Sequence, residues 1–160
     1  MPTCGFLFKE KPTPNHIIRE MIDFYQIPIC MINRIKNGED YVTNDGTVIP
    51  NSRLTIPSDP PRMYAYCSDT CYLPRIVPQI QGVDLLFHEA TFANTEAVRA
   101  KQTFHSTAAQ AALIAREAQV KKLLIGHFSA RYEDESILLK EASEIFPHTM
   151  LAEENLKISL

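Results

Sequence analysis

The feature that most constrains the fold of this chain is the alternation, after residue 62, of short apolar segments with segments of helical periodicity. The apolar segments are typical of buried strands, and their continuous hydrophobic character favours burial on both faces. Strands that alternate with helices favour an α/β fold built in layers. The pattern predicts strands over 62–67, 83–87, 123–125, 149–152 and 156–160, and helices over 73–80, 106–120 and 134–146.

The clearest of these helices is the one predicted over residues 106–120. Thr107 and Gln110 have the spacing of a capping box, in which each side chain bonds the other residue's backbone at the start of a helix. Small side chains recur on one face of the segment, which lets a helix lie close against a sheet. They are Ala108, Ala111, Ala112, Ala115 and Ala118.

The first 61 residues have a different character, because residues that form turns and break helices are dense in them. We expect a short strand over residues 4–9, a helix over 15–25 with Asn15 as its N-cap, and a hairpin over 40–49 around an Asp-Gly turn. Residues 58–61 have the composition of a linker. The change near residue 62 therefore predicts a boundary between two parts of the chain.

Composition excludes several classes of protein. The 160 residues are 45 % hydrophobic and 22 % charged, which are globular values and enough for one domain. No apolar run approaches the roughly 18 residues of a membrane span, and the first residues do not resemble a signal peptide. We therefore expect a cytoplasmic protein with reduced cysteines and no membrane contact. Because the net charge is −3, any charge that binds RNA must be local or supplied by metals or another chain.

Three of the predicted strands end in residues that bind metals or move protons. Asp69, the pair His88 and Glu89, and His127 each follow the last apolar residue of a different strand. In open α/β sheets, sites lie outside the carboxyl ends of the strands, so parallel neighbours would bring these side chains together. Histidine nitrogen and aspartate oxygen are usual ligands of hydrolytic zinc, and two-metal sites suit phosphoryl displacement. The pattern favours a metal-assisted hydrolase.

His105 precedes the capped helix and would reach the same end of the sheet. Helix N-termini bind anions, and a carboxylate such as Glu89 would stabilise a positive charge on the ring. Such a ring suits a general acid that donates a proton to a leaving oxygen. A single aspartate after a strand is commonly a turn residue, and a single histidine is commonly structural. The recurrence at three strand ends is what indicates a functional site.

Four segments follow one another along the chain: Tyr66-Cys67-Ser68-Asp69-Thr70, His88-Glu89-Ala90-Thr91-Phe92, the run from His105 to Ala112, and the run from His127 to Tyr132. Their order and spacing resemble those of ribonuclease Z, the tRNA 3′-processing endonuclease family of the metallo-β-lactamase fold. The resemblance covers most of the chain. It implies the C-terminal half of an αββα sandwich, with residues 1–9 as a strand entering the sheet, 10–61 as a protruding tRNA-binding arm and 62–160 as the half-domain.

The resemblance also implies roles for the residues at the strand ends. Asp69 resembles the ligand that bridges two zinc ions, and His127 resembles a ligand of one of them, with manganese as the other candidate metal. His105 resembles the proton donor to the leaving oxygen. Glu89 and His88 resemble the pair that supports this donor.

The family pattern implies a substrate and an assembly as well. Ser129, Arg131 and Thr107 resemble substrate contacts, and arginine suits phosphate by its fixed fork of donors. The arm implies binding of precursor tRNA, and the family is often homodimeric. Seven basic and seven acidic residues lie over residues 9–62, so attraction to tRNA would depend on how they cluster.

Two departures from the family pattern limit these implications. The sequence has no His-x-His-x-Asp-His motif and no Gly-Pro element in the arm. Two ligands, Asp69 and His127, cannot fill a tetrahedral site, so we expect the chain alone to bind zinc poorly and to be inactive. A half-sandwich would also expose an apolar sheet face, so we expect a dimer or a larger species.

Three functions stay open at this point. The first is an endoribonuclease that removes the 3′ trailer from precursor tRNA through a two-zinc site. The second is a non-catalytic module for tRNA binding or assembly, and the third is another hydrolase of the metallo-β-lactamase type. Retention of tRNA affinity without metal would separate the second from the first.

Overall fold

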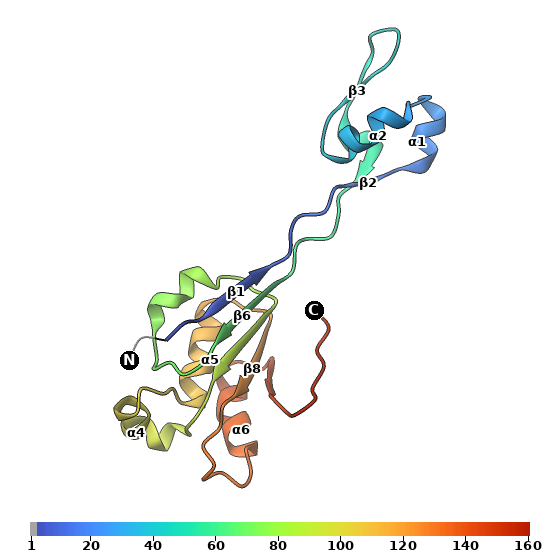
Figure 1. The fold of residues 1–160 in the computed structure, drawn as a ribbon. Helices are drawn as coiled ribbons and strands as arrows, with labels where there is room; N and C mark the ends of the chain where they lie inside the picture. The colour runs from blue at the N-terminus through green and yellow to red at the C-terminus, as the bar shows by residue number, and fades with distance from the viewer. Residues whose placement is uncertain (1–2) are drawn as a thin grey trace. The chain divides into compact units, whose positions relative to one another are not determined.

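Residues 3–160 are described by a computed structural model, in which the chain divides into two units (Figure 1). One unit contains the residues up to Glu10 together with Arg62–Leu160, and the other contains Lys11–Pro61. The division lies where the composition of the sequence changes. Among the helices of residues 3–160, none has the length and apolarity needed to cross a membrane.

The larger unit is built on one sheet with the strand order β1-β6-β7-β8-β9. β1 runs antiparallel to β6, whereas β6, β7, β8 and β9 are parallel neighbours. The carboxyl ends of the parallel strands therefore meet at one end of the sheet, as the sequence pattern required for a common site. The strands are β1 (Phe6–Lys9), β6 (Met63–Cys67), β7 (Leu85–Glu89), β8 (Lys122–Gly126) and β9 (Thr149–Leu151).

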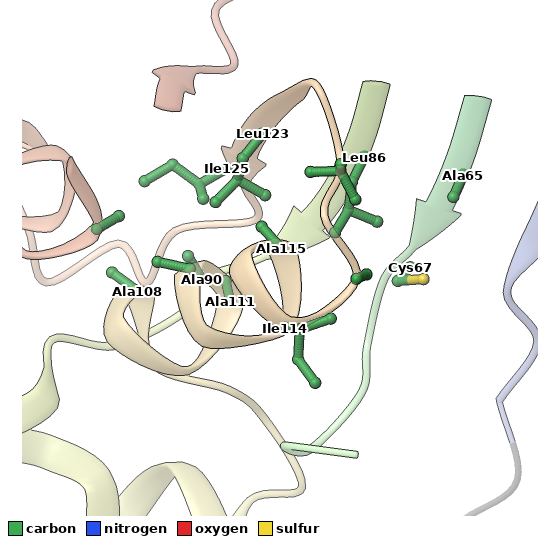
Figure 2. Close-up of a cluster of buried hydrophobic side chains, with 14 of the residues drawn as sticks. Ala65, Cys67, Leu86, Ala90, Ala108, Ala111, Ile114, Ala115, Leu123 and Ile125 are labelled. Carbon is green, nitrogen blue, oxygen red and sulfur yellow. The ribbon is translucent and has the colours of Figure 1, made fainter. Parts of the chain in front are cut away.

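Helices α5 (Ala108–Glu117) and α6 (Ser136–Ile145) connect β7 to β8 and β8 to β9. Figure 2 shows Ala111 and Ala115 of α5 beside core side chains of the strands, including Leu86 and Ile125. These four residues are wholly buried, and the predicted alanine face is thus a contact between helix and sheet. The predicted capping box at the start of α5 is confirmed, with both of its hydrogen bonds present.

The opposite face of the same sheet is aromatic. Phe8 stacks on Tyr64 with ring centroids 5.8 Å apart, and Tyr66 stacks on Phe87 at 4.7 Å. These residues alternate along their strands with the core residues, so they point away from α5. Phe8 remains 56 % exposed, which leaves this face apolar and open at β1.

The smaller unit has its own core, formed by Ile27, Ile35, Tyr41, Ile49 and Leu54. Two short antiparallel pairs and three short helices surround this core. They are β2 (His16–Ile17) with β5 (Thr55–Ile56), β3 (Tyr41–Val42) with β4 (Val48–Ile49), α1 (Arg19–Phe24), α2 (Ile29–Lys36) and α3 (Asn51–Leu54). The predicted hairpin over 40–49 is confirmed.

Some expectations drawn from the sequence are wrong. Residues 16–17 pair with a strand about 40 positions away, so α1 begins only at Arg19 and Asn15 does not cap it. Residues 156–160 form no strand, because Asn155 adopts a left-handed conformation with φ 64° and the chain turns there. The helix expected over 73–80 is a 3₁₀ helix, η1 (Pro74–Gln79), which contains Pro78.

Four helices were not expected from the sequence. They are α2 and α3 in the smaller unit, and η2 (Asn94–Glu96) and α4 (Ala97–Gln102) between β7 and α5. Each of these helices has eight residues or fewer. Over so few residues, apolar periodicity does not distinguish a helix from a loop.

Candidate metal centre

Asp69, His105 and His127 come together at the carboxyl ends of the parallel strands. Each offers one ligand atom, and these atoms all lie within 4.8 Å of one another. Asp69 Oδ1 lies 3.1 Å from Nε2 of His127, and the rings of His105 and His127 have centroids 5.3 Å apart. The structure thus brings together the predicted metal ligands and the predicted proton donor. They come from three different loops, which follow β6, β7 and β8.

The backbone at two of these residues is unusual. Asp69 has a φ of 49° and His127 has a φ of 61°, which is the left-handed region that few residues other than glycine adopt. Each such residue stores strain of about 1–3 kcal/mol, and the surrounding structure must compensate for it. His127 directly follows β8, and Asp69 lies two residues beyond the end of β6, so both residues lie at the carboxyl ends of parallel strands.

Glu89 is the buried charge around which this site is organised. Its Oε1 accepts hydrogen bonds from Thr70 N–H at 2.8 Å and from the ring of His105 at 2.8 Å. Its Oε2 lies 2.6 Å from the hydroxyl of Thr91, 3.1 Å from Ser106 N and 3.3 Å from Thr91 N. Each of these contacting groups carries a proton that it can donate. The wholly buried Glu89 side chain is therefore surrounded by donors, as a buried carboxylate requires.

The bonds of Glu89 reach all three members of the cluster. His105 is held directly, since a carboxylate has no proton to give and Nδ1 of the ring must donate. Asp69 is held through the backbone of Thr70, its neighbour in the chain. His127 is held through Thr91, whose hydroxyl lies 3.0 Å from Nδ1 of the ring. The carboxylate of Glu89 therefore positions Asp69 and the rings of both histidines.

His88 does not share this environment. Neighbouring residues in a strand point to opposite faces of the sheet, so His88 is directed into the core while Glu89 faces the site. Its Nδ1 lies 2.7 Å from the carbonyl oxygen of Glu89, and its Nε2 has no partner among the described residues. Burial lowers the pKa of His88 and keeps the ring neutral. The contact with His105 belongs to Glu89 alone, and a supporting role of His88 stays a prediction.

The three residues expected at the substrate lie in different settings. Arg131 donates from Nε to the hydroxyl of Ser129 at 3.2 Å, and its Nη1 lies 3.4 Å from Glu96. Its guanidinium also lies 5.3 Å from the centre of the Phe92 ring, and the side chain keeps 37 % exposure. Thr107 is wholly buried and its hydroxyl caps α5. We therefore keep Ser129 and Arg131 as candidate substrate contacts and assign Thr107 to the helix cap.

A pocket of about 480 Å³ opens beside His105. Tyr72 and Val98 supply apolar wall, and Lys101 supplies a positive charge. The pocket thus combines an aromatic ring, an aliphatic wall and one positive charge beside the predicted proton donor.

The geometry of Asp69 and His127 fits a shared metal ion. Two atoms bound to one zinc at about 2.0–2.1 Å with a tetrahedral angle lie about 3.3 Å apart, close to the observed 3.1 Å. A carboxylate and an imidazole are also donors of the kind that hydrolytic zinc uses. A direct ion pair is the alternative, but its side chains are 59 % and 42 % exposed, and such pairs contribute little.

Sequence reasoning assigned no role to Thr70, Thr91 or Ser106. Each contributes a backbone N–H or a hydroxyl to the Glu89 carboxylate, and the hydroxyl of Ser106 also donates to the carbonyl oxygen of Thr70 at 2.7 Å. Thr91 and Ser106 are buried polar residues. The sequence signal that could have indicated them is their type and place: small polar residues two or three positions beyond a strand end, or two positions before a helix.

Comparison with known proteins gives a consistent picture. No family model matches the chain. All 160 residues align with proteins named ribonuclease Z, at 71 % identity in Bacteroides fragilis and 70 % in Phocaeicola vulgatus. The alignments cover 53 % and 52 % of those proteins, so the chain spans about half the length of these relatives.

One solved structure supports the fold. The metallo-β-lactamase fold protein YhfI from Bacillus subtilis matches 59 % of this chain and 39 % of its own chain, with a TM-score of 0.55 and 25 % identity. The predicted α/β fold of the metallo-β-lactamase type is thereby confirmed. Likeness to this fold and to ribonuclease Z implies a metal cofactor.

Proposed function

We propose that this chain, which is similar to ribonuclease Z over its whole length, is the C-terminal half of such an enzyme and acts in tRNA 3′-end processing. In the complete protein it would supply one side of a site that cuts the 3′ trailer from precursor tRNA. The observation that carries the proposal is the convergence of Asp69, His105 and His127 around the buried Glu89. Since the relatives are about twice as long, we expect the chain alone to be inactive.

Asp69 and His127 would hold the metal in this site. Their donor types favour zinc, with manganese as the second candidate, and a complete site of this kind would hold two ions. When bound, the metal would activate water and neutralise charge on the phosphate. Asp69 would be suited to contact two ions, because a carboxylate has two oxygens and its side chain is exposed.

His105 would act as the general acid. Because Nδ1 is bonded to Glu89, the other ring nitrogen, Nε2, is the one available to a substrate. It would deliver a proton to O3′ of the tRNA as the bond between that oxygen and phosphorus breaks. The tRNA would keep a 3′-hydroxyl and the trailer would leave with a 5′-phosphate. The negative carboxylate of Glu89 would stabilise the charged ring before transfer.

Ser129 and Arg131 would contact the substrate, and residues 10–61 would bind the tRNA body. Arg131 is exposed and only loosely paired with Glu96, so it can exchange that partner for a phosphate. The unit Lys11–Pro61 has its own core, so it can be removed as a test. Glu10 and Arg62 are bonded through their backbones, and an Asn-Gly turn can join them. We expect that deletion to raise KM for precursor tRNA and to leave metal affinity unchanged.

The decisive experiment is a chimera in which this chain replaces the matching 160 residues of the Bacteroides fragilis ribonuclease Z. We expect the chimera to cleave a 3′-extended precursor tRNA. Asp69→Ala should abolish cleavage and weaken metal binding, whereas His105→Ala should reduce turnover with a smaller loss of metal. Asp134→Ala is the matched control, because this exposed carboxylate lies away from the cluster and bonds only Ser136.

Each alternative function has its own outcome in this experiment. A chimera that binds tRNA without metal and does not cleave it would favour a non-catalytic module. A chimera that hydrolyses only small phosphodiesters would favour another hydrolase of the same fold. Equal metal loss in Asp69→Ala and His105→Ala would refute their separate roles. Light scattering tests the expected homodimer, and fractionation of cells tests the expected cytoplasmic location.

A further inference from the structure

We propose that Thr91 is a positioning residue that sets the tautomer of His127, so that Nε2 and not Nδ1 of this ring is the metal-binding nitrogen. The proposal rests on the proposed function only in taking His127 as a metal ligand. It adds a residue to which the sequence pattern assigned no role.

The first step concerns the single proton of the Thr91 hydroxyl. Its oxygen lies 2.6 Å from Glu89 Oε2, 3.0 Å from the carbonyl oxygen of His127 and 3.0 Å from Nδ1 of the same residue. Two oxygens at 2.6 Å need a proton between them, and the ionised carboxylate has none to give. The hydroxyl therefore donates to Glu89, and the short distance is typical of a hydrogen bond to a charged oxygen.

The second step follows for the ring of His127. With its proton committed to Glu89, the hydroxyl of Thr91 can only accept at Nδ1. The contact of 3.0 Å is then a hydrogen bond from Nδ1–H of His127 to Thr91. In the neutral ring, a proton on Nδ1 leaves Nε2 with its lone pair. That nitrogen lies 3.1 Å from Asp69 Oδ1, where the shared metal ion would bind.

The competing arrangement reverses both protons. In it, Thr91 would donate to Nδ1, and a proton on Nε2 of His127 would bond Asp69. That arrangement leaves the hydroxyl of Thr91 and the carboxylate of Glu89 at 2.6 Å with no proton between them. It would also place a proton where the metal has to bind. The hydrogen bond from Thr91 to Glu89 therefore determines which tautomer of His127 forms, because it leaves the hydroxyl of Thr91 able only to accept from Nδ1.

The same carboxylate acts on both histidines of the cluster. His105 donates from Nδ1 directly to Glu89 Oε1, and His127 donates from Nδ1 through Thr91 to Glu89 Oε2. Each ring therefore presents Nε2 to the site. Partners of this kind, which orient a ligand without touching the metal, commonly change metal affinity by about 10- to 100-fold.

The test is the tautomer of His127, read by long-range ¹H–¹⁵N NMR on the metal-free chain labelled with ¹⁵N-histidine. The measurement is made at about pH 9, where imidazole is neutral. The chain has five histidines, and the spectrum of His127→Gln identifies the signal. We expect the Nδ1–H form in the wild type and in Thr91→Ser. Thr91→Val should lose this preference. The control Thr103→Val should keep it, since the hydroxyl of Thr103 bonds the backbone carbonyl of Arg99 in α4.

Metal titration of the chimera gives a second readout. Thr91→Val should bind zinc about 10- to 100-fold more weakly than the parent, and Thr91→Ser should restore the affinity. A wild-type ring protonated on Nε2 would overturn the proposal, even if Thr91→Val did not fold. A Thr91→Val tautomer equal to the wild type would do the same.

The two proposals can fail separately. A chimera that never cleaves tRNA, with His127 in the expected tautomer, would refute the proposed function and leave the role of Thr91 standing. A chimera that cleaves tRNA, with a tautomer that does not depend on Thr91, would refute only the role of Thr91.

Discussion

The carboxylate of Glu89 accepts a hydrogen bond of 2.8 Å from the ring of His105, although Glu89 is wholly buried and His105 is partly exposed. This pair connects the interior of the sheet to the surface at which the metal ligands lie. A buried charge is tolerated only where hydrogen bonds replace its water, and Glu89 has backbone N–H groups from three neighbouring loops. The site and the stability of the fold are thus coupled at one residue.

The first prediction follows from this coupling. Glu89→Gln would turn an amide NH₂ toward backbone N–H donors that now have an acceptor. Each buried N–H left without one should lower the free energy of unfolding by about 1–3 kcal/mol. Urea denaturation of the two proteins measures the difference. Glu96→Gln is the control, because that exposed carboxylate makes only a 3.4 Å contact with Arg131 and its loss should change stability by about 0.5 kcal/mol or less. Equal effects of the two substitutions would contradict the buried network.

The second prediction concerns pH. The pKa of His88 is lowered by burial, so the unfolded chain binds a proton that the folded chain resists. Above about pH 6.5, the ordinary pKa of histidine, neither state binds this proton and His88 does not lower the free energy of unfolding. Below that pH the unfolded chain binds the proton first, so the free energy of unfolding falls as pH falls. The slope approaches about 1.4 kcal/mol per pH unit until the lowered pKa of the folded state is reached.

The matched comparison for this effect uses two histidine substitutions. His88→Leu should remove this part of the pH dependence, while His148→Gln, at an exposed position, should leave it in place. Denaturation curves from about pH 5 to 8 measure the slopes. A wild-type slope that persists in His88→Leu would assign the effect to another group.

The third prediction is chemical. Burial raises the pKa of the Cys67 thiol to about 11, and only the thiolate reacts with alkylating reagents. We expect Cys4 and Cys30, which are exposed, to be modified by iodoacetamide at least about 100-fold faster than Cys67 in the folded chain. Mass spectrometry of peptides over time measures the rates. In urea the rates should become similar, and fast labelling of Cys67 without denaturant would show that β6 is not packed against the core.

The fourth prediction concerns the residue before His127. A Cβ added at Gly126 would lie 2.8 Å from the Phe87 ring and 3.1 Å from Cβ of Ala152. Gly126→Ala should therefore displace β8 or the ring and destabilise the fold by about 1–3 kcal/mol. Because the displacement adjoins His127, metal affinity of the chimera should fall as well.

A compensating substitution gives the control for Gly126→Ala. Phe87→Leu removes the ring carbons that the new Cβ would meet. The double variant should thus be more stable than the sum of the single effects predicts, in a double-mutant cycle. Simple additivity would show that the contact with Phe87 does not determine the cost.

The parts of this fold that sequence patterns predict are those determined by near neighbours. The capping box of Thr107 and Gln110 operates over three residues, and it forms as expected. The hairpin over 40–49 depends on one tight turn, and it also forms. By contrast, residues 16–17 follow a helical pattern and yet pair with residues 55–56, because a distant strand satisfies their backbone groups.

For the candidate site, the residue types that follow each strand can be read from the sequence, and the parallel order of β6, β7 and β8 makes Asp69, Glu89 and His127 neighbours. That Glu89 faces the site while His88 faces the core became known only from the folded chain. The same holds for the left-handed backbone at Asp69 and His127 and for the contact of Thr91 with both Glu89 and His127. Side-chain patterning acts over a few residues, whereas these features depend on strand register and on hydrogen bonds between loops far apart in the chain.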